Sequence, residues 1–137
     1  MKYTTDENQL TKLLSKKLPL SFRGIYSSYE LVHSPRAMGW PVQPPHALII
    51  NTDSKNLPGK HWVAIYITEN GQGEVMDTHR WINNKYLIQP PKSDSCGQFC
   101  ADYLIRRSLA DSMDSVLAIF TTNLHANEKS VLSRIRV

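Results

Sequence analysis

The chain lacks the features that mark membrane-spanning and secreted proteins. None of its apolar runs approaches the roughly 18 residues that a membrane-spanning helix needs, and its N-terminal residues show no signal-peptide pattern. We therefore expect no membrane partner. The sequence also has no internal repeat or low-complexity segment, and its 137 residues suit one domain, 1–137, that is large enough for a real core.

The sequence has too few clustered cysteines and histidines for a zinc site. Structural zinc sites normally combine two closely spaced ligand pairs. Cys96 and Cys100 could form one pair, but a second is missing because the histidines at positions 33, 46, 79 and 125 stand alone. The sequence therefore predicts neither a metal nor any other cofactor.

The charge balance is mildly basic, with 16 Lys and Arg against 12 Asp and Glu and a net charge of +4. The basic residues gather near the N-terminus, at Lys12, Lys16, Lys17 and Arg23, and again at 106–107. No aromatic side chains are interleaved with them, so a solvated face is the default interpretation. Contact with nucleic acid remains the alternative.

Apolar spacing predicts one helix and then three strands in the first part of the chain. The helix is amphipathic, is capped by Thr5 or Asp6, and ends before Pro19. The strands are predicted at residues 47–52, 61–68 and 74–78. A loop rich in proline and aromatic residues, 35–45, is the expected substrate-facing wall.

Three further helices are predicted in the C-terminal part. One begins at Cys96, the next at Asp111 or Ser112, and the last is capped by Asn127. The order of helix, strands and helices indicates an α+β fold, in which a small central β-sheet packs against the helix that begins at Cys96.

A turn signal places a histidine near an acid. Residues 70–73, with the sequence Asn-Gly-Gln-Gly, are typical of the turn between two antiparallel strands. Such a hairpin brings His61, at the start of the first strand, near Asp77, at the end of the second. Glu74 is the competing acid, but it lies beside the turn, at the other end of the hairpin from His61.

Cys96 has the surroundings expected of a thiol nucleophile. A free thiol has a pKa of about 8.5 and needs a helix N-terminus or an imidazolium to stabilise the thiolate at neutral pH. Ser93, Asp94 and Ser95 are helix-capping residue types directly before Cys96, which would lie in the first turn, where the helix dipole favours negative charge. Cys100, one turn later, fits a small buried core residue.

The same region offers donors for an oxyanion. Gly97 has no side chain, so a substrate carbonyl could approach the helix start and accept a hydrogen bond from the Cys96 amide. The side-chain amide of Gln89, seven residues before the cysteine, can supply a second donor. His61, Asp77, Gln89 and Cys96 are thus the candidate catalytic residues, as base, orienting acid, oxyanion donor and nucleophile.

The order His, acid, Gln, Cys resembles that of adenain, the adenovirus-type cysteine protease family, within the wider clan of ubiquitin-like protein deconjugases. Four segments carry the resemblance: residues 22–26, 49–52, the strand from His61, and the block 89–100. The resemblance implies an adenain-like cysteine protease fold in a minimal version and the same four catalytic roles. Adenain has Glu as its acid and the deconjugases have Asp, so Asp77 fits the clan more than its adenoviral branch.

Two departures from adenain accompany the resemblance. Only residues 78–88 connect Asp77 to Gln89, where adenain has a long segment with its own secondary structure, so the placement of Gln89 is the part of the transfer most affected. Adenain is also linked to an activating viral peptide through a separate cysteine. This chain has no cysteine to spare, and we do not expect that disulfide.

Three functions are compatible with these motifs. The first is a cysteine endopeptidase that processes precursor proteins of a virus or virus-like mobile element, as segments 22–26 and 49–52 indicate. The second is a deconjugase that removes a ubiquitin-like modifier, as Asp77 indicates, and the third is an inactive pseudoprotease that binds peptides. The resemblance implies a monomer with a protein or peptide substrate and weak stimulation by DNA. We expect a reducing intracellular compartment, the host nucleus or the virion, because the nucleophile must stay a free thiol.

Overall fold

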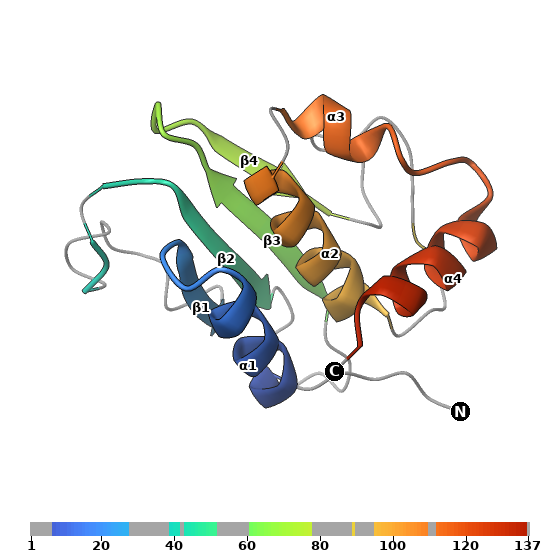
Figure 1. Ribbon diagram of the computed structural model, residues 1–137, viewed down its shortest axis with the longest axis horizontal. Coiled ribbons are helices and arrows are strands. Elements are labelled where there is room, and N and C mark those ends of the chain that lie inside the picture. Colours follow the sequence, from blue (N-terminus) through green and yellow to red (C-terminus); the bar gives the residue numbers. More distant parts are fainter. Residues whose placement is uncertain are drawn as a thin grey trace.

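The computed structural model describes residues 7–27, 39–41, 43–51, 61–77, 89, 95–109 and 112–136. Within these ranges the chain forms an α+β fold with a small four-stranded mixed sheet and four helices, which confirms the predicted α+β class (Figure 1). The helices are α1 (Glu7–Lys17), α2 (Cys96–Leu109), α3 (Met113–Leu117) and α4 (Leu124–Arg134). The strands are β1 (Phe22–Ser27), β2 (His46–Asn51), β3 (Trp62–Ile67) and β4 (Gly73–Met76).

The sheet has the order β1-β2-β3-β4, and the edge strand β1 was not predicted. β1 pairs in parallel with β2, whereas the other neighbours are antiparallel. A register shift between Phe22 and Gly24, with φ 123° at Gly24, interrupts the alternation of side chains along β1. This irregularity hides the period of two that identifies a strand in a sequence.

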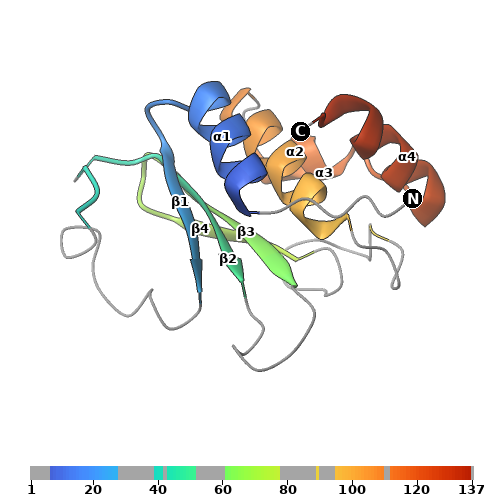
Figure 2. The same ribbon diagram turned by 90° about the horizontal axis from the view of Figure 1, so that it is seen from below.

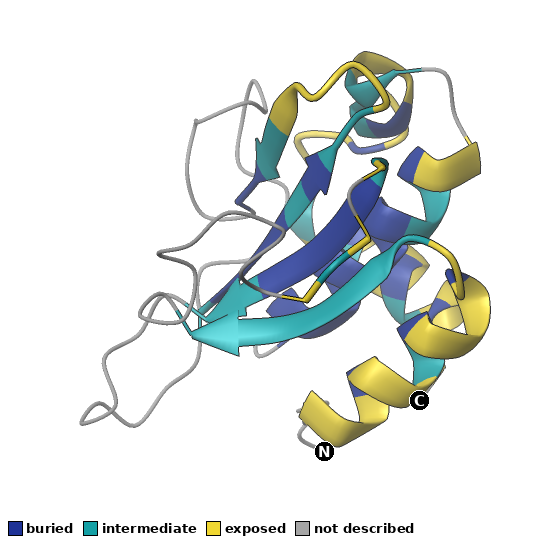
Figure 3. Ribbon diagram, turned by 90° about the vertical axis from the view of Figure 1, so that its left-hand side faces the viewer, coloured by how far each residue is buried: buried dark blue, intermediate teal, exposed yellow. Residues whose placement is uncertain are grey.

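The helices cover one face of the sheet (Figure 2). Alternate residues of β3 point to this face, and Trp62, Ala64 and Tyr66 join the buried core cluster with Phe99 and Tyr103 of α2. The two middle strands are the most buried, while β1 is intermediate throughout (Figure 3). Each large apolar side chain buried in this layer stabilises the fold by about 1.5–3 kcal/mol, so α2 is held firmly on β3.

Each of the two C-terminal helices begins at a polar residue whose side chain caps it. Ser112 caps α3 and its side chain accepts a hydrogen bond from the Ser115 amide, which confirms one of the two predicted caps. The prediction that Asn127 caps α4 is wrong, because Asn123 takes that role and accepts from the Ala126 amide. Asn127 lies inside the helix, where its buried side chain bonds the backbone N–H and C=O of Thr121.

Several sequence predictions fall outside the described residues. Among them are the first-helix caps Thr5 and Asp6, the start candidate Asp111, and residues 35–38 of the predicted substrate wall. Trp40, in the described part of that loop, donates a hydrogen bond from Nε1 to the Tyr26 hydroxyl at 2.9 Å, and its ring centroid lies 5.4 Å from that of His46. His46 pairs with Ile67, at the end of β3 away from His61, so Trp40 lies far from His61, and the role of this loop as a substrate-facing wall stays a prediction.

The arginines and the lysines of the two basic clusters differ in their contacts. Arg106 and Arg107 form ion pairs with Asp102 and Glu74, and the Nε of Arg23 donates to Nδ1 of His46 at 2.8 Å. The lysines of α1 are exposed, as predicted: Lys12, Lys16 and Lys17. In the described part of the chain no helix is long and apolar enough to cross a bilayer.

Candidate active site

The hairpin of β3 and β4 brings together the residues that flank it. Gly71, with φ 84°, allows the tight turn, and backbone hydrogen bonds between Thr68 and Gln72 and between Gly71 and Thr68 close it. His61 directly precedes β3 and Asp77 directly follows β4, so both lie at the open end of the hairpin. Their side chains meet, with 2.7 Å between His61 Nε2 and Asp77 Oδ1.

Glu74, the competing acid, is engaged elsewhere. Its carboxylate accepts two hydrogen bonds from Arg107, Nε to Oε1 at 2.7 Å and Nη2 to Oε2 at 3.0 Å. The hydroxyl of Tyr103 also donates to Oε1, at 3.2 Å. Arg107 lies over the ring of Tyr66, 4.7 Å from its centroid. Of the two acids, Asp77 is therefore the partner of His61, and Glu74 anchors the hairpin to α2.

The surroundings of His61 favour its charged form. The pKa of His61 is raised to about 9, chiefly by its hydrogen bond to Asp77 and next by a hydrogen bond to the side chain of Cys96, while partial burial opposes the rise. Asp77 is only 2% exposed, so its carboxylate is held in a dry environment next to the ring. Because Nε2 faces Asp77, Nδ1 is the nitrogen left for the thiol. Near neutral pH the ring is an imidazolium between a carboxylate and a sulfur.

Cys96 is the first residue of α2. The carbonyl of Ser95 accepts the first hydrogen bond of the helix, from the Phe99 amide at 3.0 Å, which makes Ser95 the N-cap residue. The other two predicted caps, Ser93 and Asp94, lie outside the described residues. The thiol at this position faces the positive end of the helix dipole, as the sequence predicted.

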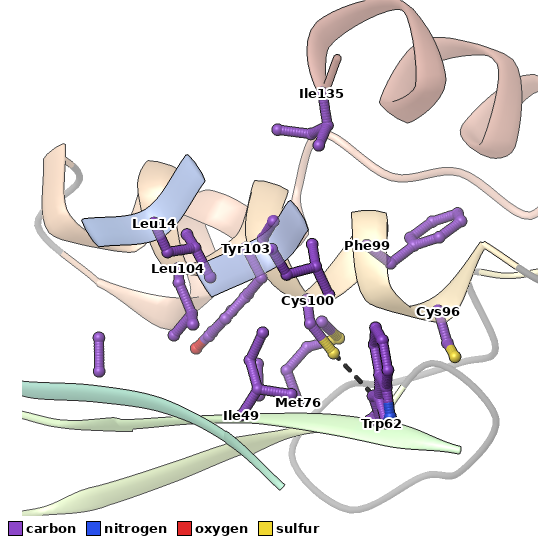
Figure 4. Packing of buried hydrophobic residues seen from close by; sticks show 14 of the residues in the cluster. Leu14, Ile49, Trp62, Met76, Cys96, Phe99, Cys100, Tyr103, Leu104 and Ile135 are labelled. Atoms are coloured by element: carbon purple, nitrogen blue, oxygen red, sulfur yellow. Dashed lines mark hydrogen bonds between the residues drawn. The ribbon is translucent and has the colours of Figure 1, made fainter. Parts of the chain in front are cut away.

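The missing side chain of Gly97 has a structural role that differs from the role expected from the sequence. A Cβ at this position would lie 2.4 Å from Cζ3 of Trp62 and 2.8 Å from Cδ1 of Leu10. The indole of Trp62 therefore occupies the space beside Gly97. Figure 4 shows the indole against the first turn of α2, which carries Cys96. The lack of a side chain lets α2 approach β3 and α1 closely, so the space beside Gly97 is filled by the core and not by a substrate carbonyl. The approach of a carbonyl to the Cys96 amide stays a prediction.

Cys100 is a core residue, as predicted. It is fully buried, and its Sγ donates to the carbonyl oxygen of Trp62 at 3.3 Å (Figure 4). Burial raises its pKa well above the usual value of a thiol. The structure thus distinguishes the two cysteines of α2, because one contacts an imidazolium and the other stays protonated in the core.

Gln89 is fully buried. The segments on either side of it, 78–88 and 90–94, lie outside the described residues. Its burial is compatible with an amide held inside the protein, and its role as the second oxyanion donor stays a prediction. The structure therefore joins three of the four predicted residues, His61, Asp77 and Cys96, through side-chain hydrogen bonds.

One contact at this site was not predicted from the sequence. The hydroxyl of Ser95 donates to Oε1 of Glu128 in α4 at 2.7 Å. The two residues are 33 positions apart, and no local motif marks Glu128 as a neighbour of the nucleophile. Only the packing of α4 beside α2 brings them together.

The described residues contain no group of three or more His, Cys, Asp and Glu side chains that could hold a metal ion. His33 and His79 lie outside them. The reactive groups that the described residues bring together at this site are the thiol, the imidazolium and the carboxylate.

The resemblance noted in the sequence has no counterpart in wider comparisons. No protein-family model matches this chain, and no curated protein matches it either.

Proposed function

We propose that the chain is a cysteine endopeptidase with Cys96 as its nucleophile. The observation that carries the proposal is the continuous set of side-chain hydrogen bonds from Asp77 through His61 to Cys96. A thiol at the first position of a helix, paired with an imidazolium that a buried carboxylate holds in place, is the arrangement that makes a thiolate available at neutral pH.

The reaction follows from the same geometry. The Cys96 thiolate attacks the peptide carbonyl carbon, and the electron pair of the C=O bond moves to oxygen. The backbone N–H of Cys96 and the amide of Gln89 donate hydrogen bonds to this oxyanion. His61 then gives its proton to the leaving amine as the C–N bond breaks, and a thioester remains.

Hydrolysis of the thioester regenerates the site. His61, now neutral, takes a proton from a water molecule that attacks the thioester carbonyl. Collapse of the second tetrahedral intermediate releases the carboxylic acid and the Cys96 thiolate, with the imidazolium again beside it. Asp77 keeps Nε2 of His61 directed towards itself throughout, so that Nδ1 faces the sulfur.

The substrate class comes from the motif resemblance. The order His61, Asp77, Gln89, Cys96 and the packing of α2 against β3 support a minimal adenain-like fold. The adenain-like segments 22–26 and 49–52 belong to the adjacent strands β1 and β2. On this basis we propose precursor proteins of a virus or virus-like mobile element as substrates, with the protein acting as a monomer in a reducing compartment and with weak stimulation by DNA.

One observation favours a second candidate. The acid bonded to His61 is an aspartate, the type that the ubiquitin-like deconjugases carry in this role. A deconjugase would use the same nucleophile and base on the bond that follows a C-terminal Gly-Gly.

A peptide library tests the proposal. A proteome-derived set of peptides is incubated with the wild type, with Cys96→Ala and with Cys100→Ala, and new termini are counted by mass spectrometry. We expect internal cleavages with the wild type and with Cys100→Ala, and none with Cys96→Ala. Cleavage confined to fluorogenic esters or amides after a modifier's C-terminal Gly-Gly would instead favour the deconjugase. No cleavage, together with no labelling of Cys96 by iodoacetamide, would leave only the pseudoprotease.

A further inference from the structure

A carboxylate of α4 is bonded to the residue directly before the nucleophile. Ser95 is fully buried, and its hydroxyl donates to Oε1 of Glu128 at 2.7 Å. Glu128 itself is half-buried and also lines a shallow surface cavity of about 430 Å³ along α4, with His125, Lys129, Leu132 and Ser133. The carboxylate thus lies between solvent and the buried start of α2.

Ser95 determines where Cys96 lies. As the N-cap residue it accepts the first helical hydrogen bond, from Phe99, and its backbone leads directly into the Cys96 amide. A hydroxyl that donates to a fixed acceptor loses the rotation that it would otherwise have. The bond to Glu128 therefore fixes the cap, and with it the position of the Cys96 amide and thiol.

The acceptor itself is rigidly placed. Arg134, later in α4, donates from Nε and Nη2 to the two carboxylate oxygens of Asp102, at 3.1 and 2.7 Å. Asp102 is a buried residue of α2, and the fully buried Val131 packs α4 into the common core. α4 is therefore attached to α2 in two places, at the residue before the nucleophile and at Asp102.

We infer that Glu128 is a positioning residue for Cys96: it holds the Ser95 cap so that the thiol and the Cys96 amide stay aligned with His61. The inference rests on the proposed peptidase function, and it adds to it a residue from α4 that touches neither the substrate nor the reacting atoms. Its effect must appear in the rate of the chemical step rather than in substrate affinity.

The test compares variants that separate the hydrogen bond from the charge. Glu128→Ala removes the acceptor, Ser95→Ala removes the donor, and Glu128→Gln keeps an acceptor oxygen without the charge. Lys129→Ala is the matched control, because this neighbour lines the same cavity. Steady-state kinetics on one peptide from the library are measured together with the rate at which iodoacetamide labels Cys96, and thermal unfolding confirms that each variant is folded.

We expect Glu128→Ala and Ser95→Ala each to lower kcat by about 10-fold with KM within about twofold of the wild type. The double variant should be no slower than either single one, since both remove the same bond. Glu128→Gln should recover most of kcat, and Lys129→Ala should leave it unchanged. Labelling of Cys96 should slow in the two alanine variants.

Three results would overturn the inference: kcat of Glu128→Ala within twofold of the wild type, additive losses in the double variant, or a Gln variant as slow as the Ala variant. If the wild type cleaves no peptide, this result contradicts the proposed function but not the positioning role of Glu128. The positioning role is then judged from the labelling rates alone, and equal rates in wild type and Glu128→Ala would reject it. If the Glu128→Ala variant does not fold, the kinetics of Ser95→Ala and Glu128→Gln test the inference instead.

Discussion

The indole of Trp62 lies where a side chain at position 97 would begin, since a Cβ on Gly97 would be 2.4 Å from Cζ3 and 2.5 Å from Cε3 of that ring. The first turn of α2, which carries Cys96, is therefore set against β3 by direct contact between helix backbone and indole. The placement of the Cys96 thiol therefore depends on Gly97, a residue that has no side chain.

Gly97→Ala should consequently destabilise the protein and impair the site. Neither the ring nor the strand behind it can move away without disturbing the core, and overpacking of this kind typically costs about 1–3 kcal/mol. Urea denaturation measures the loss. Gly73→Ala is the control, because a Cβ at Gly73 meets nothing within 4 Å. Equal stability of the two variants would show that the indole yields easily.

Cys96→Ala should abolish peptide cleavage while leaving the fold intact, because alanine is acceptable in the first turn of a helix. Cys100→Ala should keep its activity and lose some stability, since it leaves a small void in the core and removes the bond to the Trp62 carbonyl. Cleavage assays and thermal unfolding of both variants check this. Reversed phenotypes would mean that the nucleophile has been misassigned.

The acid is tested by a second pair of variants. Asp77→Asn should leave a small but measurable activity, as the amide keeps its volume but no longer stabilises the imidazolium. Glu74→Gln should retain activity, although weakening the ion pair with Arg107 will lower stability. The comparison is made from kcat/KM of each variant on the same peptide. A large loss at Glu74 with none at Asp77 would transfer the acid role.

Stability should fall on the alkaline side of neutrality. The pKa of His61 is about 9 in the folded protein, above the value of about 6.5 in an unfolded chain. A group whose pKa is raised by folding contributes its full stabilisation below the unfolded pKa and loses it as the pH rises through the folded one. We expect a loss of about 1–2 kcal/mol between pH 6.5 and 9.5 after allowance for solvent screening.

Urea denaturation across this range, with the wild type and Asp77→Asn in parallel, measures the effect. The variant lacks the main cause of the raised pKa, so its unfolding free energy should change less with pH. Identical pH dependence in the two proteins would show that the bond between Asp77 and His61 does not produce the shift.

Gln89→Ala should lower kcat by about 10²- to 10³-fold with little change in KM, because an oxyanion donor acts on charge that exists only in the transition state. Alkylation of Cys96 by iodoacetamide should be almost unaffected. An unchanged kcat would mean that the short connection from Asp77 directs the amide elsewhere, and that the resemblance to adenain fails at this position.

Local patterns were sufficient for the hairpin and for the start of α2. The glycine-rich turn between β3 and β4 determines which ends meet, and the polar residues before Cys96 mark a helix start. The acid was also predictable, because Glu74 lies beside the turn and cannot reach His61. These features depend on neighbours in the sequence.

The features that the sequence missed depend on tertiary contacts. Asn123 and Asn127 are the same residue type four positions apart, and only the buried bonds of Asn127 to Thr121 show which one caps α4. The register shift at Gly24 interrupts the alternating pattern by which β1 could have been predicted. The contact of Glu128 with Ser95 exists only because α4 packs beside α2. The close packing that requires glycine at position 97 likewise follows only from the position of Trp62.

The contrast between the two thiols of α2 has a practical consequence for counting intact molecules. Cys96 keeps 7% of its surface exposed at the helix start, whereas Cys100 is sealed in the core. A folded chain should therefore take up one equivalent of an alkylating reagent and a denatured chain two. A fully folded preparation should therefore give a ratio of native to denatured uptake of about one half, and unfolded molecules raise this ratio towards one.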